Sequence, residues 1–79
     1  MPREPRSADV VAEMVANVMK VSVAPGDEVA IGDTVCLLES MKMEIPVLAE
    51  AAGVVAAIRV APGDVVQEGD VLVELVVAR

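Results

Sequence analysis

The sequence predicts an all-β fold, a flattened β-barrel or sandwich of two four-stranded antiparallel sheets with internal pseudo-two-fold symmetry. Valine makes up 18 of the 79 residues, and β-branched residues interrupted by Gly and Pro are typical of short strands joined by turns. The chain also repeats itself, because "VSVAPGDEVAIGDTVCLL" (residues 21–38) aligns with "IRVAPGDVVQEGDVLVEL" (residues 58–75). Two copies are too few for a solenoid. Since neither half has a second layer to cover its apolar face, the halves are expected to pack as one closed unit.

Short strands alternate with turns along the chain. Each copy of the repeat contains a Pro-Gly-Asp and a Gly-Asp sequence, which predict tight turns because Pro fixes φ and Gly accepts positive φ. The first eight residues contain two prolines and two arginines, so residues 1–8 are expected to be a disordered tail and residues 9–79 one domain. The expected strands lie near residues 10–14, 18–23, 28–30, 35–40, 43–48, 53–60, 65–67 and 71–77.

Alternation of residue types predicts which side chains face the core. Met19, Val21 and Val23 share one face of a strand, while Lys20 and Ser22 share the other. A slip of one residue would exchange the two faces, so the same pattern in the second copy supports this register. The corresponding residues are Ala56, Ile58 and Val60 inward with Ala57 and Arg59 outward, and further along Cys36 and Leu38 match Val73 and Leu75, all inward.

The composition excludes several classes of function. The net charge is −7, whereas a nucleic-acid-binding surface needs clustered Lys and Arg. The chain has one Cys and no His, Phe, Tyr or Trp, which removes the usual general base, stacking platforms, internal disulfides and Cys-based metal cages. No apolar run approaches the ~18 residues of a membrane span, and Asp9 and Glu13 interrupt the one stretch that resembles a signal peptide. We therefore expect a cytoplasmic protein without nucleic-acid or membrane partners.

The sequence "LLESMKMEIPV" (residues 37–47) places Lys42 at the expected tip of a hairpin. Two-residue hairpin turns favour Asn-Gly or similar pairs at positive φ, and Met and Lys carry a steric cost there. Met41 and Met43 place flexible thioethers on both sides of the lysine, and such side chains suit an adaptable recognition surface. The other lysine, Lys20, lacks this frame and is interpreted as an ordinary exposed charge. Lys42 is therefore the candidate functional residue.

The remaining chemically active residues are assigned structural roles. Glu39 and Glu44 flank the tip and are interpreted as solvated charges or docking contacts. Cys36 lies on an inward strand face and is expected to be a buried thiol without nucleophilic activity. The spacing of four aspartates fits no EF-hand loop, and turn capping explains them; they are Asp27, Asp33, Asp64 and Asp70.

The stretch "ESMKMEI" (residues 39–45) resembles the biotinylation motif of biotinyl domains, whose core is Met-Lys-Met. Together with the flanking Gly-Asp turns, it makes residues 10–77 resemble the biotinyl/lipoyl domain family, in particular free-standing biotin carboxyl carrier proteins of acyl-CoA carboxylase type. The resemblance implies a flattened barrel with biotin in amide linkage to Lys42, and recognition by a biotin protein ligase through Met41 and Met43. "EMVANVM" replaces the family's Pro-Met-Pro-Gly-like segment, and the strand spacing leaves no room for the protruding thumb of some bacterial carriers.

The resemblance also implies a non-catalytic carrier that serves separate enzymes. A biotin carboxylase would load the cofactor from ATP and bicarbonate, and a carboxyltransferase would pass the carboxylate to an acceptor such as an acyl-CoA. Two alternatives remain open. One is a lipoyl carrier, although the tip of lipoyl domains usually reads Asp-Lys-Ala. The other is an unmodified β interaction module, in which nothing would favour a strained Met-Lys-Met tip.

Overall fold

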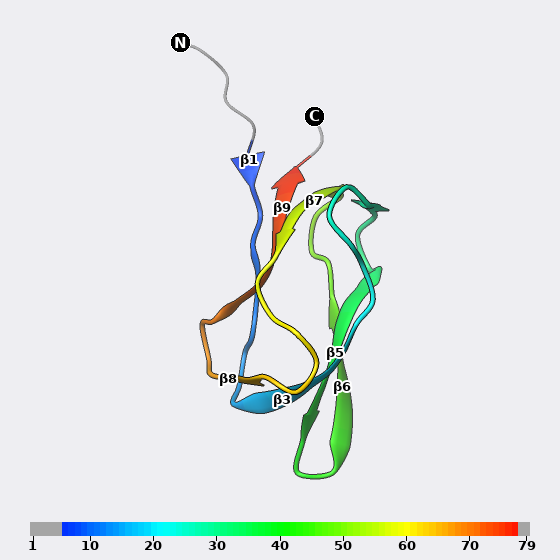
Figure 1. Ribbon diagram of the computed structural model, residues 1–79. Helices are drawn as coiled ribbons and strands as arrows, with labels where there is room; N and C mark the ends of the chain where they lie inside the picture. The colour runs from blue at the N-terminus through cyan, green and yellow to red at the C-terminus, as the bar shows by residue number, and fades with distance from the viewer. Residues whose placement is uncertain (1–5, 78–79) are drawn as a thin grey trace.

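The computed structural model describes residues 6–77, which form two antiparallel sheets and confirm the predicted all-β fold (Figure 1). One sheet has the order β1-β9-β7-β4, with β2 also paired to β9, and the other has the order β6-β5-β3-β8. Because β1 and β2 follow one another along β9, each sheet is four strands wide. No helix among the described residues is long and apolar enough to cross a membrane. The strands are β1 (Arg6–Ser7), β2 (Val10–Val11), β3 (Ala16–Val21), β4 (Glu28–Val29), β5 (Thr34–Ser40), β6 (Met43–Leu48), β7 (Gly53–Ile58), β8 (Val65–Val66) and β9 (Val71–Val77).

The pseudo-two-fold relation extends over the described chain. Strand β6 is equivalent to β1 and β2 together, β7 to β3, β8 to β4 and β9 to β5, all at the offset of the sequence repeat. Each sheet combines strands of both halves, because β9 and β7 lie between β1/β2 and β4, while β5 and β3 lie between β6 and β8. Each half supplies the two central strands of one sheet and the edge strands of the other, so neither half completes a sheet alone and the two copies fold as one unit.

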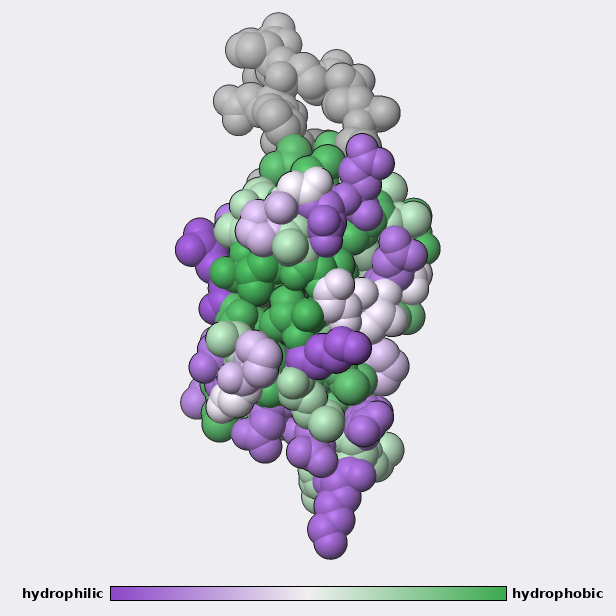
Figure 2. All heavy atoms as spheres, turned by 45° about the vertical axis from the view of Figure 1, so that its right-hand side comes forward, coloured by the Kyte–Doolittle hydropathy of each residue, from purple (hydrophilic) through white to green (hydrophobic). Residues whose placement is uncertain are grey.

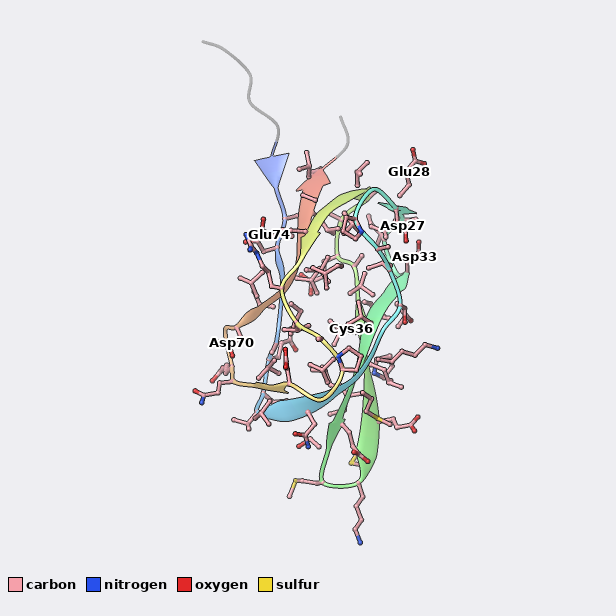
Figure 3. The ribbon with its side chains drawn as sticks, in the orientation of Figure 1. Asp27, Glu28, Asp33, Cys36, Asp70 and Glu74 are labelled. Atoms are coloured by element: carbon pink, nitrogen blue, oxygen red, sulfur yellow. The ribbon has the colours of Figure 1, made fainter. Side chains whose placement is uncertain are left out.

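Four equivalent turns are closed by an aspartate. In the first, the Asp27 carboxylate accepts a hydrogen bond from the Ala24 N–H at 2.8 Å. Gly26 has φ +94°, which an L side chain rarely adopts. Its N–H donates to the Val55 carbonyl at 2.8 Å, which joins the turn to strand β7. The same carboxylate bond recurs at 2.8–2.9 Å in the other three turns, at Asp33, Asp64 and Asp70, and confirms the predicted capping role. Figure 3 shows Asp27, Asp33 and Asp70 at the periphery of the barrel.

The core is aliphatic and is repeated in both halves. Val35 and Cys36 are consecutive and both fully buried, because the register of β5 against β6 shifts between Thr34 and Cys36. The equivalent shift in β9 buries Leu72 and Val73 together. The inward positions predicted in these two strands are confirmed, at 0–1% exposure, for Cys36, Leu38, Val73 and Leu75.

The prediction that Met19 and Ala56 face the core is wrong. A β-bulge between Val18 and Lys20 shifts the register of β3, so that Val18 is buried and Met19 is 40% exposed. An equivalent bulge between Val55 and Ala57 leaves Ala56 exposed. A bulge adds one unpaired residue and so breaks strict alternation. The other predicted inward residues pack against the core as expected; they are Val21, Val23, Ile58 and Val60. Of the predicted outward residues, Lys20, Ser22 and Arg59 are exposed.

The sheet begins earlier than the sequence indicates. The predicted tail, residues 1–8, includes Arg6–Ser7, which pair with Val77 and Val76 of β9; residues 1–5 lie outside the described residues. The expected strand at 10–14 is reduced to Val10–Val11, and β3 begins at Ala16. Two-residue strands carry too little pattern to be read from sequence, so their pairing partners determine their limits.

Candidate functional site

The candidate site is the β5–β6 hairpin, which projects from one end of the barrel (Figure 1). Strands β5 and β6 pair along their whole length, and the last pair before the turn joins Ser40 to Met43. Met41 and Lys42 are therefore the two central residues of the turn. The tip lies at the end of the molecule opposite to where β1 begins and β9 ends. This arrangement confirms the predicted position of Lys42 at a hairpin tip.

The backbone of the turn is strained at both central residues. Met41 has φ 53° and Lys42 has φ 66°, and within residues 6–77 no other residue except glycine has a positive φ. Two-residue turns of this type require positive φ at both positions and normally contain Asn-Gly. A residue with a Cβ pays about 1–2 kcal/mol for this conformation. The expected steric cost of Met and Lys at the tip is thus present.

The side chains of the tip are directed to solvent. Met41 is 90% exposed and Met43 64% exposed, and Lys42 is also exposed. Burial in the core accounts for neither methionine, since both are among the large apolar side chains that the fold leaves uncovered. The ion pair found among residues 6–77 joins Arg59 to Glu74. Within this part of the chain the Lys42 amine therefore forms no ion pair with a carboxylate.

The surroundings of Lys42 offer a projecting amine and little acid–base machinery. Glu39 and Glu44 lie directly opposite one another in the hairpin ladder, a placement of like charges that disfavours the closed hairpin. Cys36 is enclosed in the core (Figure 3), where desolvation raises the pKa of its thiol. A neutral, inaccessible thiol is a poor nucleophile. Residues 6–77 contain no group of three or more His, Cys, Asp and Glu placed to hold a metal ion. Lys42 is therefore an exposed amine at a projecting tip, without a nucleophilic or metal-binding group among the described residues beside it.

The pseudo-two-fold explains why one tip is distinguished. At the opposite end, Arg6 pairs with Val77 in the same way that Met43 pairs with Ser40. There, β9 ends and β1 begins, whereas β5 and β6 are joined by the turn. Of these two equivalent strand pairs, one therefore carries a hairpin tip.

Sequence reasoning missed an apolar groove between the edge strands of the two sheets. The groove is lined by residues 8–11, 13–14 and 45–51, together with Ile31, Gly32 and Leu38. The signal was present, because "VVAEM" (residues 10–14) recurs as "VLAEA" (residues 47–51) at the same offset as the recognised repeat.

Comparisons with known proteins agree on the family. The sequence profile of the biotin/lipoyl family, described as biotin-requiring enzyme, matches residues 3–75. The biotinylated protein TB7.3 homolog of Mycolicibacterium smegmatis is 65% identical over 40 residues, which are 51% of this chain and 56% of that protein. The chain thus matches about half the length of its curated relative.

Two solved structures share the fold over nearly the whole chain. Urea carboxylase from Kluyveromyces lactis superposes with TM-score 0.85 and 32% identity over 96% of this chain and 7% of the enzyme. A single-chain, multi-domain long-chain acyl-CoA carboxylase gives TM-score 0.86 and 26% identity over 100% of this chain and 8% of the enzyme. In both, the similarity is confined to one small part of a large carboxylase.

Proposed function

Because the chain belongs to the biotin/lipoyl family of biotin-requiring enzymes, we propose that it is a biotin carboxyl carrier whose Lys42 bears biotin in amide linkage. Attached biotin supplies a site that takes up carboxylate at one active centre and gives it up at another. The observation that carries the assignment is the pair of positive φ angles at Met41 and Lys42. Strained residues that turn chemistry does not need are found at functional sites, where another requirement maintains them.

The residues of this chain present the attachment point and leave chemistry to other proteins. The ladder between β5 and β6 holds the tip on a rigid element, and the four-carbon stem of Lys42 adds reach. Amide formation removes the ammonium charge. The modified side chain therefore loses less hydration free energy when it enters a pocket of a partner enzyme.

Met41 and Met43 are proposed to contact the enzymes that act on Lys42. Met41 is 90% exposed and Met43 is 64% exposed, and an unbranched thioether side chain adapts to surfaces of different shape. A carrier meets at least three different partners. These are a biotin protein ligase, a biotin carboxylase and a carboxyltransferase. The carboxylase and the carboxyltransferase are proposed to be those of an acyl-CoA carboxylase, because the likeness to a long-chain acyl-CoA carboxylase covers the whole chain.

The test is attachment of biotin to Lys42 in the chain produced together with a biotin protein ligase. The intact mass should increase by one biotinyl group in the wild type and in the matched control Lys20→Arg, and should not increase in Lys42→Arg. Streptavidin binding should follow the same pattern, while circular dichroism shows that all three proteins are folded. Biotin on the Lys42→Arg protein would refute the site, and a lipoyl increment on protein from its own cell would favour a lipoyl carrier instead.

A further inference from the structure

A second surface feature, apart from the hairpin tip, is the groove between the edge strands of the two sheets. It has a volume of about 590 Å³ and is lined by residues of two equivalent segments, 8–11 with 13–14 and 45–51, together with Ile31, Gly32 and Leu38. Strand β2 lies on one side of the groove and β6 on the other. The groove therefore lies along a seam where the edge strands β2 and β6 of the two sheets are not paired with each other.

Large apolar side chains remain uncovered along this seam. Val11, Met14 and Leu48 line it and are 40–46% exposed, and Ile31 is 72% exposed. Ile31 occupies a turn position that is Glu68 in the other half, so the turn does not require an apolar residue there. Figure 2 shows on one face how a hydrophobic area of the barrel is bordered by hydrophilic residues. Clustered exposed apolar side chains with a polar rim are typical of interaction sites.

The charge of the groove indicates the kind of partner. Its described lining includes Asp9, Glu13 and Glu50 and no Lys or Arg. A second copy of the chain docked about a two-fold axis would place these carboxylates against one another, and the whole chain already carries −7. A partner with Lys or Arg around an apolar ridge would complement both the centre and the rim.

The groove favours side-chain docking over addition of a strand. Pro46 lies in edge strand β6 and has no N–H to donate to an added strand. Strand β2 is two residues long, and its pairing with β9 shifts register between Val10 and Val11. Neither edge offers a continuous ladder, so the contacts of a partner come from side chains that enter the apolar seam.

The position of the groove connects it to the tip. Ile45 and Leu48 line the groove three and six residues after Lys42, which at about 3.4 Å per residue is on the order of 10–20 Å along the strand. The groove is therefore close to the tip but does not include Lys42. A partner can therefore hold the groove while Lys42 enters its active site.

We propose that the groove is the docking surface for the biotin carboxylase, which presents an apolar ridge flanked by Lys or Arg, and that docking keeps Lys42 within reach of its active site. This proposal rests on the proposed function for the identity of the partner. Contact area away from the reacting lysine would also supply binding that the small tip does not.

The test uses two substitutions that each copy the residue found at the equivalent position of the other half. Ile31→Glu introduces into the groove the residue type that Glu68 has at the equivalent position. The control Val65→Glu introduces on β8, outside the groove, the residue type of its equivalent Glu28. Both positions are at least 65% exposed, so both proteins are expected to fold. Direct binding to the biotin carboxylase from the same cell should weaken at least about tenfold for Ile31→Glu, the effect of losing one well-packed interface side chain, and should not change for Val65→Glu.

Binding by the Lys42→Arg protein separates docking from modification. It should bind the biotin carboxylase as tightly as unmodified wild type, which tests the groove whether or not Lys42 is the biotin site. With biotinylated proteins, Ile31→Glu should raise KM for the carrier about tenfold and leave kcat unchanged. Equal affinities for Ile31→Glu and Val65→Glu would overturn the proposal. Slower biotin attachment as the only defect of Ile31→Glu would also overturn it, because the groove would then belong to the ligase. A wild-type dimer in sedimentation that Ile31→Glu dissociates would overturn it as well, because the groove would then bind a second copy of the chain.

Discussion

Replacing the central turn residues with a favourable pair is expected to stabilise the protein while removing its site. The double substitution Met41→Asn and Lys42→Gly creates the Asn-Gly pair that two-residue hairpin turns prefer. Met41 and Lys42 sit at φ 53° and 66°, and each residue with a Cβ costs about 1–2 kcal/mol there. Asn tolerates this region and Gly occupies it freely. Met41 is 90% exposed, so little burial is lost.

The magnitude follows from the relief of strain less the flexibility that glycine adds to the unfolded chain. Removing the strain at both positions would stabilise the protein by roughly 2–4 kcal/mol at most. Asn removes only part of the strain at position 41, and the greater flexibility of Gly in the unfolded chain costs about 0.4–1 kcal/mol. A net gain of about 1–2 kcal/mol in the free energy of unfolding is expected. For a domain of this size, each kcal/mol raises Tm by about 4–8 °C.

The assay is thermal and urea unfolding of the unmodified proteins. The matched control is Met41→Ala with Lys42→Ala, which removes the same side chains and the same charge but keeps a Cβ at both strained positions. The Asn-Gly protein should unfold at a higher temperature and urea concentration than both wild type and the Ala-Ala protein. If it unfolds no later than the Ala-Ala protein, the tip is not strained, and the argument from strain to function fails.

Three further predictions concern the core, the tip and the close pairing of β7 with β9. Cys36 should react with thiol reagents only on unfolding, because it is fully buried and burial raises the pKa of its thiol; rapid labelling of the native protein would mean that the core is open at β5. Met43→Leu should change stability by no more than about 0.5 kcal/mol but slow biotin attachment or biotin-dependent carboxylation, and unchanged rates with a lower Tm would make Met43 a packing residue. Gly53→Ala should destabilise by about 1–3 kcal/mol, because its Cβ would collide with the backbone oxygen of Val76. The equivalent Ala16→Gly should cost about 0.5–1 kcal/mol, and equal effects of the two changes in unfolding experiments would contradict a close approach of β9 to Gly53.

Local chemistry determined much of this protein from the sequence alone. The Gly-Asp turns were predictable because Gly26 and its equivalents supply positive φ and the following aspartates bond to the backbone three residues earlier. Those interactions lie within four residues, so the sequence contains both partners. The hairpin tip at Lys42 was predictable for the same reason, as two strand patterns meet there with two residues between them. The inward placement of Cys36 and Leu38 followed from alternation confirmed by the second half of the repeat.

Tertiary structure decided what depends on residues far apart in the chain. Met19 is exposed because a bulge forms in β3 where it pairs with β5, and alternation within one strand contains no information about its partner. Arg6–Ser7 became a strand because β9, at the other end of the chain, offers a free edge. The groove arose where the edges of the two sheets face one another, so that Val11 and Leu48 line one surface. Turns depend on neighbours in sequence, whereas bulges, short edge strands and grooves depend on pairing, which only the folded chain defines.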